Sequence, residues 1–332
     1  MSNSYKDVMA RRNEIMRSAL GLDYDEFNIS PIAFDYEAMM AATGYSLDDV
    51  AEIQRSTKVG RTPLHELHRL TEAVRAIAGP GKGARILVKD EAANASGSFK
   101  ARRASLSAHE ARKKGFKGMV TATSGNYGAA VASQAAQQGL KCIVIQEVYD
   151  SEHVGQPEIV EKSRACEAYG AEVVKLTVGP ELFYVLLRTL EETGYFNASL
   201  YTPYGIAGVE TLGAEIGREV EERYGRQPDV VAVTHAGGGN LTGGPRPAQG
   251  GLRPDPGGGG LRRPHRPAHG IRQGLQQQVL HHGAHRFRGA VRHLARPGGR
   301  AAQRGPRPAV HERLPPGHPG RGLLHDRAAD ET

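Results

Sequence analysis

The sequence is poor in cysteine and has no long apolar segment. Cys142 and Cys166 are its only cysteines among 332 residues, which is too few for a disulfide framework and typical of packed thiols in a reducing cytosol. No apolar run approaches the roughly 20 residues that a membrane-spanning helix needs. The first 20 residues include Asp7 and Glu14, unlike a secretory signal or a transit peptide. We therefore expect a cytoplasmic protein without membrane association.

Lysine is absent from residues 241–332, and this absence separates the C-terminal part from the rest. That part holds 16 Arg and 5 acidic residues, whereas residues 1–240 hold 27 basic and 31 acidic residues. The net charge of +7 thus belongs to the C-terminal part. It also contains 12 of the 19 Pro, 18 of the 42 Gly and one aromatic residue, Phe287. Such a segment cannot bury enough apolar surface to offset the entropy lost on ordering.

We therefore interpret residues 244–332 as a disordered tail or as the out-of-frame translation of a GC-rich gene. Enrichment in Arg, Pro, Gly, Ala and His without Lys or Asn motivates the second explanation. An Arg-rich tail that neutralises nucleic-acid phosphates is the alternative. Because aromatic residues that could stack on bases are nearly absent, we do not expect a nucleic-acid partner. His281, His282 and His285 lack nearby Cys or carboxylate ligands, and no metal site is predicted.

Short apolar runs and helical segments alternate from about residue 115 onwards. Strands of about four to six residues followed by helices of about a dozen indicate βαβ units and a parallel sheet. Right-handed crossovers then cover both faces of the sheet. The predicted fold class is α/β, and residues 1–60 are expected to be helical. The expected strands are residues 119–123, 142–145, 171–176 and 230–233, and the expected helices are residues 129–139, 157–169, 181–193 and 208–224.

Lys100 is placed where a strand is expected to run into a helix. The pattern predicts a strand over residues 85–91 and a helix over residues 101–114. Ser98 is a good N-cap, because its hydroxyl can accept a backbone N–H of the first turn. Lys100 then lies in that turn, where the helix dipole disfavours an ammonium group. A neutral lysine can condense with a carbonyl to form a Schiff base, although a solvated lysine at a helix start also fits this segment alone.

Two glycine-containing turns follow expected strands. One spans residues 123–128 (Thr-Ser-Gly-Asn-Tyr-Gly) and the other residues 237–240 (Gly-Gly-Gly-Asn). Small residues let backbone N–H groups approach an anion, and a helix N-terminus favours negative charge. Asn126 adds a side-chain amide that can donate to an oxygen. Each turn alone is equally compatible with a structural role, because such turns are common in α/β proteins.

Together and in this order, the three motifs resemble those of the tryptophan-synthase-β-like enzymes, the fold type II family that uses pyridoxal phosphate. Residues 60–64 (Gly-Arg-Thr-Pro-Leu) resemble a further segment of that family. The resemblance implies two domains, and it implies that Lys100 is the catalytic residue that holds the cofactor through a Schiff base. The other residues that it implicates are Asn126 for the ring hydroxyl oxygen of the cofactor, Thr123, Ser124 and Gly125 for the substrate carboxylate, and Gly237, Gly238, Gly239 and Asn240 for the phosphate.

Four further segments are similar to the β subunits of 2-amino-4-oxopentanoate thiolases, a group within that family. They are residues 8–16, 155–162, 178–184 and 192–200. The similarity implies that coenzyme A cleaves this amino-acid substrate to acetyl-CoA and alanine in ornithine degradation, with an α subunit as partner. Ala101 departs from the family pattern, which usually has Asp after the lysine, and is expected to lower efficiency. Two alternatives stay open: β-elimination or β-replacement, as in threonine synthase or dehydratase, and an inactive remnant.

The similarity also suggests a division into domains. Residues 1–60 are expected to form a helical N-terminal segment, and residues 61–243 a pyridoxal-phosphate-binding α/β region. Within that region a small domain, at about residues 105–200, is inserted in a large domain. The similarity stops near Gly243, where the family continues into the rest of its large domain. We therefore expect the large domain to be incomplete.

Overall fold

The computed structural model describes residues 4–30, 33–123, 125–199, 202–234 and 239–240, and these belong to one compact unit. The predicted tail, residues 244–332, lies outside the described residues, and the predicted domain boundaries stay predictions.

The helices are α1 (Tyr5–Ala10), α2 (Arg12–Leu20), α3 (Tyr36–Ala41), α4 (Leu47–Ser56), α5 (His68–Ala78), α6 (Lys100–Lys113), α7 (Asn126–Gln138), α8 (Pro157–Ala168), α9 (Glu181–Thr193) and α10 (Pro203–Tyr224), with the 3-10 turns η1 (Tyr24–Phe27) and η2 (Glu91–Ala93). The strands are β1 (Asn28–Ser30), β2 (Ala33–Phe34), β3 (Leu64–Glu66), β4 (Leu87–Lys89), β5 (Gly118–Thr123), β6 (Lys141–Tyr149), β7 (Glu172–Thr177) and β8 (Phe196–Asn197).

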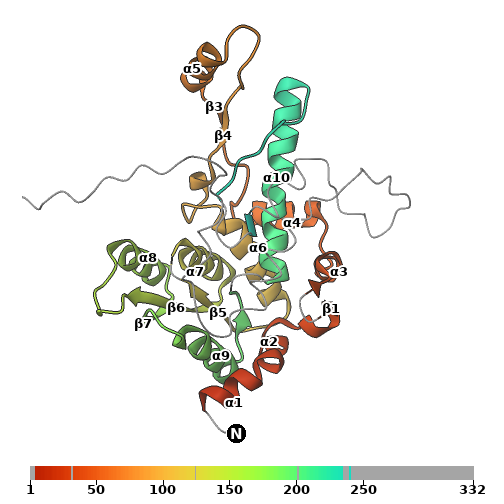
Figure 1. Cartoon of the computed structure of the whole chain (residues 1–332). Helices are drawn as coiled ribbons and strands as arrows, with labels where there is room; N and C mark the ends of the chain where they lie inside the picture. Colours follow the sequence, from red (N-terminus) through yellow and green to blue (C-terminus); the bar gives the residue numbers. More distant parts are fainter. Residues whose placement is uncertain (1–3, 31–32, 124, 200–201, 235–238, 241–332) are drawn as a thin grey trace, which may run out of the picture. The chain divides into compact units, whose positions relative to one another are not determined.

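Four parallel strands form the main sheet, in the order β7-β6-β5-β8. Helices α7, α8 and α9 connect these strands in chain order. Helices α7 and α8 cover one face of the sheet, and α9 covers the other face together with α1 and α2 (Figure 1). The structure therefore confirms the predicted α/β class, with a parallel sheet and helices on both faces.

Alternating residues of the central strands divide the core into two layers. Met119 of β5 and Val144 of β6 belong to a cluster with α6, α7 and α10. Val120 and Ile145, their neighbours in sequence, pack instead with α2 and α9. Successive side chains of a strand point to opposite faces of the sheet. A strand that is covered on both faces therefore needs a continuous apolar run. Residues 142–145 form such a run, and they lie in β6 as predicted.

Helices α6 and α10 pack closely against each other beside the sheet. Gly208 permits this approach, because a Cβ atom at that position would collide with the carbonyl oxygen of Arg102. Gln54 of α4 bridges the two helices, because its Nε2 atom donates to the carbonyl oxygens of Arg102 (3.2 Å) and Gly208 (2.7 Å). The start of α6, which carries Lys100, is thereby fixed against two other helices.

The strand predictions need two corrections. Only Leu87–Lys89 of the expected strand over residues 85–91 forms a strand, and it pairs antiparallel with β3. Residues 230–233 form no strand, and Val230 is 81% exposed. A strand needs a partner for its backbone N–H and C=O groups, and no described strand pairs with residues 230–233. Among the described residues, no helix combines the length and the apolarity that a membrane span requires.

Candidate functional site

The first turn of α6 places Lys100 at the first residue of the helix. The N-cap is Phe99 rather than Ser98, and no side chain caps the helix, so the prediction of a Ser98 hydroxyl cap is wrong. The physical reason is that the backbone closes this turn by itself. The N–H of Ala101 donates to the carbonyl oxygen of Ser98 (3.2 Å), and that of Arg102 donates to Phe99 (3.0 Å). The Ser98 hydroxyl is left buried, without a hydrogen-bond partner among the described residues.

Lys100 is partly buried, and its ammonium group lies 4.4 Å from the centroid of the Phe99 ring. Burial, followed by the positive charge of Arg103, lowers the pKa of Lys100 from 10.5 to about 8. A lysine with this pKa has a substantial neutral fraction near neutral pH. The direction agrees with the prediction of a neutral amine. The causes are desolvation and a neighbouring cation.

The turn between β5 and α7 presents backbone N–H groups at a helix start. Thr123 is buried at the end of β5, and its Oγ1 atom accepts from the N–H of Gly125 (3.2 Å). Gly125 is the N-cap of α7 and no side chain caps the helix there. Asn126 is the exposed first residue of α7. Ser124 lies outside the described residues. The first N–H groups of a helix have no acceptor within the helix, so a helix start favours an anionic ligand group.

The second predicted turn is described only in part. Gly237 and Gly238 lie outside the described residues, whereas Gly239 and Asn240 have helical backbone conformation. Gly239 is buried, and a Cβ atom added to it would lie 3.3 Å from the Nη1 atom of Arg103. Gly239 therefore lies against Arg103 of α6, one helical turn after Lys100.

Arg103 connects the three predicted motifs. Its side chain is 2% exposed, and its guanidinium carbon lies 5.1 Å from the centroid of the Tyr127 ring in the first turn of α7. The same guanidinium faces Gly239 and lowers the pKa of Lys100. Arg103 is not among the site residues predicted from the sequence. The available signal was its position three residues after Lys100, because residues i and i+3 of a helix share a face.

Arg102, unlike Arg103, forms ion pairs, and these connect several elements of the fold. It is fully buried, and its guanidinium donates to the carboxylates of Glu91 (2.8 Å) and Glu215 (2.8 Å). Glu215 also accepts from the backbone N–H of Arg61 (3.0 Å). Burial alone raises the pKa of Glu215, but the hydrogen bond and charge of Arg102 outweigh it and lower that pKa to about 2. These contacts join η2, α10 and the Gly60–Leu64 segment to the start of α6.

The residues present fit a group that carries an aldehyde and a phosphate. The Ser96 and Ser98 hydroxyls are buried and have no partner among the described residues, so each can donate to a ligand oxygen. Gly239 leaves space beside a cation. The lowered pKa of Lys100 favours the amine that can attack an aldehyde. These residues are therefore compatible with the aldehyde and the phosphate of pyridoxal phosphate.

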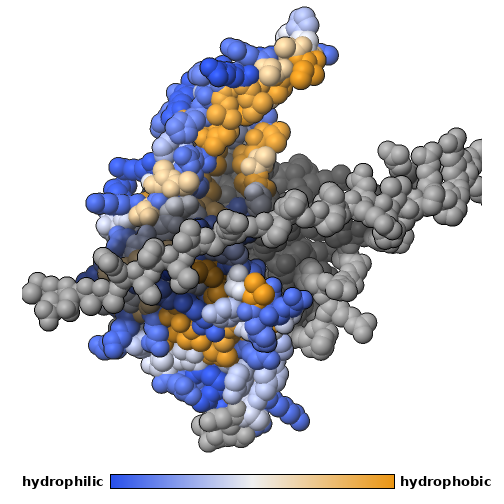
Figure 2. Space-filling view, turned by 90° about the vertical axis from the view of Figure 1, so that its left-hand side faces the viewer, coloured by the Kyte–Doolittle hydropathy of each residue, from blue (hydrophilic) through white to orange (hydrophobic). Residues whose placement is uncertain are grey.

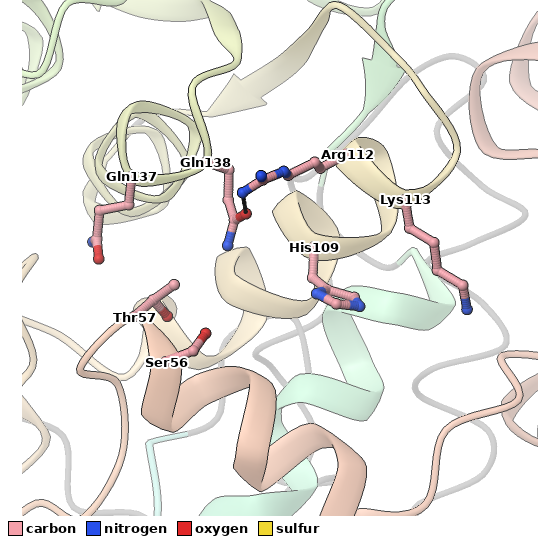
Figure 3. A pocket seen from close by; sticks show the side chains of 7 residues that line it. All are labelled: Ser56, Thr57, His109, Arg112, Lys113, Gln137 and Gln138. Atoms are coloured by element: carbon pink, nitrogen blue, oxygen red, sulfur yellow. Dashed lines mark hydrogen bonds between the residues drawn. The ribbon is translucent and has the colours of Figure 1, made fainter.

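A cavity of about 610 Å³ lies at the other end of α6 (Figure 3). It is lined by Ser56, Thr57, His109, Arg112, Lys113, Gln137 and Gln138. Three helices, α4, α6 and α7, end here, and basic side chains at a helix C-terminus complement its negative dipole end. Lys100 and Lys113 are separated by the length of α6, about 20 Å at about 1.5 Å per residue. This cavity is therefore separate from the Lys100 site. Within the described ranges, no group of three or more His, Cys, Asp or Glu residues could hold a metal ion.

A family model described as "Pyridoxal-phosphate dependent enzyme" matches residues 55–257. This range includes Lys100, the Thr123–Gly128 turn and the glycine turn. The match covers more than half of the chain.

Curated relatives show similarity over the same part of the sequence. The 2-amino-4-ketopentanoate thiolase beta subunit of Acetoanaerobium sticklandii is 65% identical over 240 residues, which are 72% of this chain and 51% of that protein. A protein of the same name from an unknown prokaryotic organism is 67% identical over the same coverage. The threonine synthase of Halalkalibacterium halodurans is 30% identical over 185 residues, which are 55% of this chain and 47% of that protein. The chain thus spans about half the length of the curated relatives it matches.

Proposed function

Because the chain belongs to the family of pyridoxal-phosphate dependent enzymes, we propose that it is the β subunit of a 2-amino-4-oxopentanoate thiolase. The observation that carries this proposal is the 65% and 67% identity to the two thiolase beta subunits, combined with a half-buried lysine beside Arg103. The proposed reaction is the thiolytic cleavage of the substrate by coenzyme A, which forms acetyl-CoA and alanine during ornithine degradation.

Lys100 is the proposed attachment point of pyridoxal phosphate. Gly237, Gly238, Gly239 and Asn240 hold the phosphate, and Arg103 supplies a nearby positive charge. Asn126 binds the ring hydroxyl oxygen. The substrate carboxylate is held by Thr123, Ser124 and Gly125 at the N-terminus of α7, which no side chain caps and which favours an anion.

In the bound state, pyridoxal phosphate supplies an electron sink for carbanion chemistry at the amino acid. Once the substrate amine has taken its place, the freed Lys100 Nζ would accept the proton from Cα, because its lowered pKa makes it a base near neutral pH. In the overall reaction, the thiol sulfur of coenzyme A bonds to C4 and the C3–C4 bond breaks. The electron pair left on C3 takes up a proton, Lys100 Nζ returns a proton to Cα, and the products are alanine and acetyl-CoA.

The thiol of this reaction comes from coenzyme A rather than from the chain. Cys142 lies in β6 and Cys166 in α8, and both are buried free thiols. Burial raises the pKa of Cys142 to about 12 and that of Cys166 to about 11. Because the thiolate is the nucleophile, neither cysteine is suited to attack a carbonyl. Buried free thiols also support the proposed cytoplasmic location, and the beta-subunit name of the relatives supports an α subunit as partner.

The similarity to threonine synthase supports a second candidate function, β-elimination or β-replacement on an amino acid. This candidate shares the cofactor and Lys100 with the first one but does not use coenzyme A. The identity of 30% to threonine synthase, against 65% to the thiolase beta subunit, favours the thiolase.

The test begins with cofactor attachment. The full chain is incubated with pyridoxal phosphate, reduced with borohydride, digested and analysed by mass spectrometry. We expect the modification on the peptide that contains Lys100, its loss in Lys100→Ala and its retention in Lys113→Ala, the same change at the other end of α6. Modification of both variants alike would contradict the assignment, and an unmodified wild-type chain would identify an inactive remnant.

Product analysis then separates the two reactions. The chain is combined with an α subunit and 2-amino-4-oxopentanoate, with and without coenzyme A. Acetyl-CoA and alanine that form only with coenzyme A support the thiolase. Products that form equally well without coenzyme A would identify an elimination or replacement enzyme.

A further inference from the structure

The cavity at the C-terminal end of α6 has no part in the proposed reaction. Its volume of about 610 Å³ lies within the range of small-molecule sites, and about 20 Å of helix separate it from Lys100. In Figure 3, Arg112 and Gln138 border the cavity on one side, and Ser56 and Thr57 border it on the other. The cavity is therefore large enough for a ligand of its own.

The end of the molecule that carries this cavity is positively charged. Residues 111–146 contain five basic residues and no acidic residue, and all five basic residues are exposed. They lie at one end of the sheet, because α6 and α7 end just before β5 and β6 begin. The starts of these two strands lie side by side, since Gly118 pairs with Lys141. Such a concentration of positive charge attracts anions.

Arg112 is the cation best placed to meet an anion in the cavity. Its Nη1 atom donates to Oε1 of Gln138 at 3.1 Å, and this neutral partner leaves the positive charge of the guanidinium uncompensated. The neighbouring cation, Lys113, contacts Tyr45 instead, with its Nζ atom 3.2 Å from the hydroxyl oxygen and 4.8 Å from the ring centroid. Because a guanidinium can bind two oxygens of one phosphate, we assign the anion to Arg112 rather than to Lys113.

Two carboxylates line a second cavity, of about 360 Å³, which shares His109 with the first one. They belong to Asp49 and Glu52, and both have partners on their own helix or at its start. Asp49 accepts from the backbone N–H (2.8 Å) and the hydroxyl (2.6 Å) of Ser46, and Glu52 forms an ion pair with Arg55. These carboxylates therefore do not neutralise the positive charge of the first cavity.

His109 adds a hydrogen-bond donor to the first cavity. Burial lowers the pKa of His109; the charge of Glu110 opposes this effect, and the charges of Lys113 and Arg112 add to it. The imidazole is therefore neutral near neutral pH and offers one N–H donor. Its ring packs nearly perpendicular to that of Tyr45, with 5.9 Å between the centroids. This contact holds the imidazole in place.

The remaining lining of the first cavity consists of amides and hydroxyls, from Gln137, Gln138, Ser56 and Thr57. The Oε1 atom of Gln138 accepts from Arg112, so its Nε2 atom can donate to a ligand. The hydroxyls of Ser56 and Thr57 donate to backbone carbonyl oxygens of α4. Their oxygen atoms can therefore accept hydrogen bonds from hydroxyl groups of a ligand.

This lining contrasts with the apolar surface found elsewhere on the molecule. Figure 2 shows apolar residues gathered in a band over the part in which Figure 1 places α5, β3 and β4. Among the described residues that line the first cavity, none has a phenyl, phenol or indole ring. A nucleotide base would find no such ring to stack on, whereas the hydroxyls of a sugar would find hydrogen-bond partners. The lining thus favours a ligand that is rich in hydroxyl groups.

We propose that the cavity at the C-terminal end of α6 is a binding site for a sugar phosphate. Arg112, His109 and Gln138 donate to the phosphate oxygens. Ser56 and Thr57 accept from the sugar hydroxyls. The inference concerns a second site, and it does not depend on the reaction proposed above.

Isothermal titration calorimetry on the full 332-residue chain tests the proposal at constant ionic strength. The probes are glucose 1-phosphate, which has no free aldehyde that could react with Lys100, inorganic phosphate, methyl glucoside and AMP. We expect glucose 1-phosphate to bind at least about fivefold more tightly than inorganic phosphate, because hydroxyl contacts add to those of the phosphate. Methyl glucoside should not bind measurably, and AMP should bind no more tightly than glucose 1-phosphate.

Variants locate the site. Arg112→Gln should weaken the binding of glucose 1-phosphate at least about tenfold, since it removes a charged hydrogen-bond donor. Lys113→Gln is the matched control, because it removes the same charge one residue further along α6, and it should change the affinity less than about threefold. Arg103→Met alters the surroundings of Lys100 and should leave the affinity unchanged. Arg112 and Lys113 are exposed, so their variants should keep the circular dichroism of the wild type.

Three results would overturn the proposal. The first is a wild-type chain that binds neither glucose 1-phosphate nor inorganic phosphate in the millimolar range. The second is equal affinity in Arg112→Gln and wild type, or a loss of binding in Arg103→Met, which would place the ligand at the Lys100 site. The third is AMP that binds at least about tenfold more tightly than glucose 1-phosphate, as base stacking would cause. A chain that binds glucose 1-phosphate as expected but attaches no pyridoxal phosphate would contradict the proposed function and leave the second site intact.

Discussion

At the scale of single residues, the protonation of Lys100 is set by its surroundings. Partial burial removes water from the ammonium group, and the guanidinium of Arg103 adds repulsion. Both effects favour the neutral amine. Lys100 lies in the first turn of a helix, as predicted from the sequence. The cation that helps to lower its pKa, Arg103, lies three residues further along the same helix.

The first prediction concerns the pH dependence of cofactor attachment. The neutral fraction of Lys100 rises as the pH passes through about 8, instead of the ordinary 10.5. The rate of pyridoxal-phosphate capture, trapped with borohydride at several pH values, should therefore have a midpoint near pH 8. Arg103→Met removes a positive charge, so its midpoint should move to higher pH. Lys113→Met removes a charge at the far end of α6 and should not move it. Equal midpoints in wild type and Arg103→Met would show that Arg103 does not tune Lys100.

The second prediction concerns the buried pair of Arg102 and Glu215. Glu215 is ionised above its ordinary pKa of 4.5 and stays ionised in the folded chain down to about pH 2. Its ionisation therefore contributes stability that is present above pH 4.5 and is lost as the pH falls towards 2. Glu215→Gln should be less stable than wild type at pH 6, by about 3 kcal/mol or more because Arg102 loses a charged partner.

The gap between the two proteins should narrow at pH 3. Urea unfolding at both pH values measures it, with Glu222→Gln, an exposed position on the same helix, as the control. A gap that stays constant between pH 6 and pH 3 would contradict the role assigned to the Arg102–Glu215 pair.

At the scale of secondary-structure elements, the contact between α6 and α10 depends on one glycine. A Cβ atom on Gly208 has no space beside the carbonyl group of Arg102, and backbone cannot rotate away as a side chain can. The third prediction is that Gly208→Ala lowers the free energy of unfolding by about 1–3 kcal/mol, the usual cost of overpacking.

Arg218→Ala, an exposed position on α10, is the matched control and should change stability by less than about 0.5 kcal/mol. Thermal and urea unfolding give both values. Because α6 carries both Lys100 and Arg103, its displacement in Gly208→Ala should also weaken pyridoxal-phosphate binding. A variant as stable as wild type would mean that α6 and α10 can separate without loss.

At the scale of the whole molecule, residues 1–240 and residues 244–332 differ sharply in composition. Residues 1–240 contain the elements of an α/β enzyme, and the thiolase relatives match 240 residues. Residues 244–332 are rich in Arg, Pro and Gly and contain no Lys, a composition that we interpret as that of a disordered tail or of an out-of-frame translation.

The fourth prediction concerns the origin of that tail. Translation of the coding DNA after codon 243 in the other two frames should restore alternating strands and helices with similarity to the thiolase beta subunits. The sequence of the gene and its three-frame translation are sufficient for this test. If neither frame restores such a pattern, the frameshift explanation is wrong, and a natural Arg-rich tail becomes the better interpretation.

The sequence by itself determined the features that depend on neighbouring residues. Apolar runs such as residues 142–145 fixed the strands of the parallel sheet, because a strand that is buried on both faces must be apolar throughout. The spacing of the lysine and glycine motifs identified the family, which the match over residues 55–257 confirmed. The roles of Asn126 and of the glycine turn remain predictions.

Tertiary structure decided the features that depend on distant parts of the chain. Residues 230–233 have a strand sequence, but a strand exists only where another strand supplies hydrogen-bond partners. The Ser98 side chain could cap a helix, but the first turn of α6 is closed by backbone hydrogen bonds, without the Ser98 hydroxyl. Arg103 became part of the site because folding brings Gly239 and Tyr127 to it from far along the chain. The propensity of a segment to form a helix or a strand depends on adjacent residues. The electrostatic environment of a side chain and the pairing of strands depend on segments that only folding brings together.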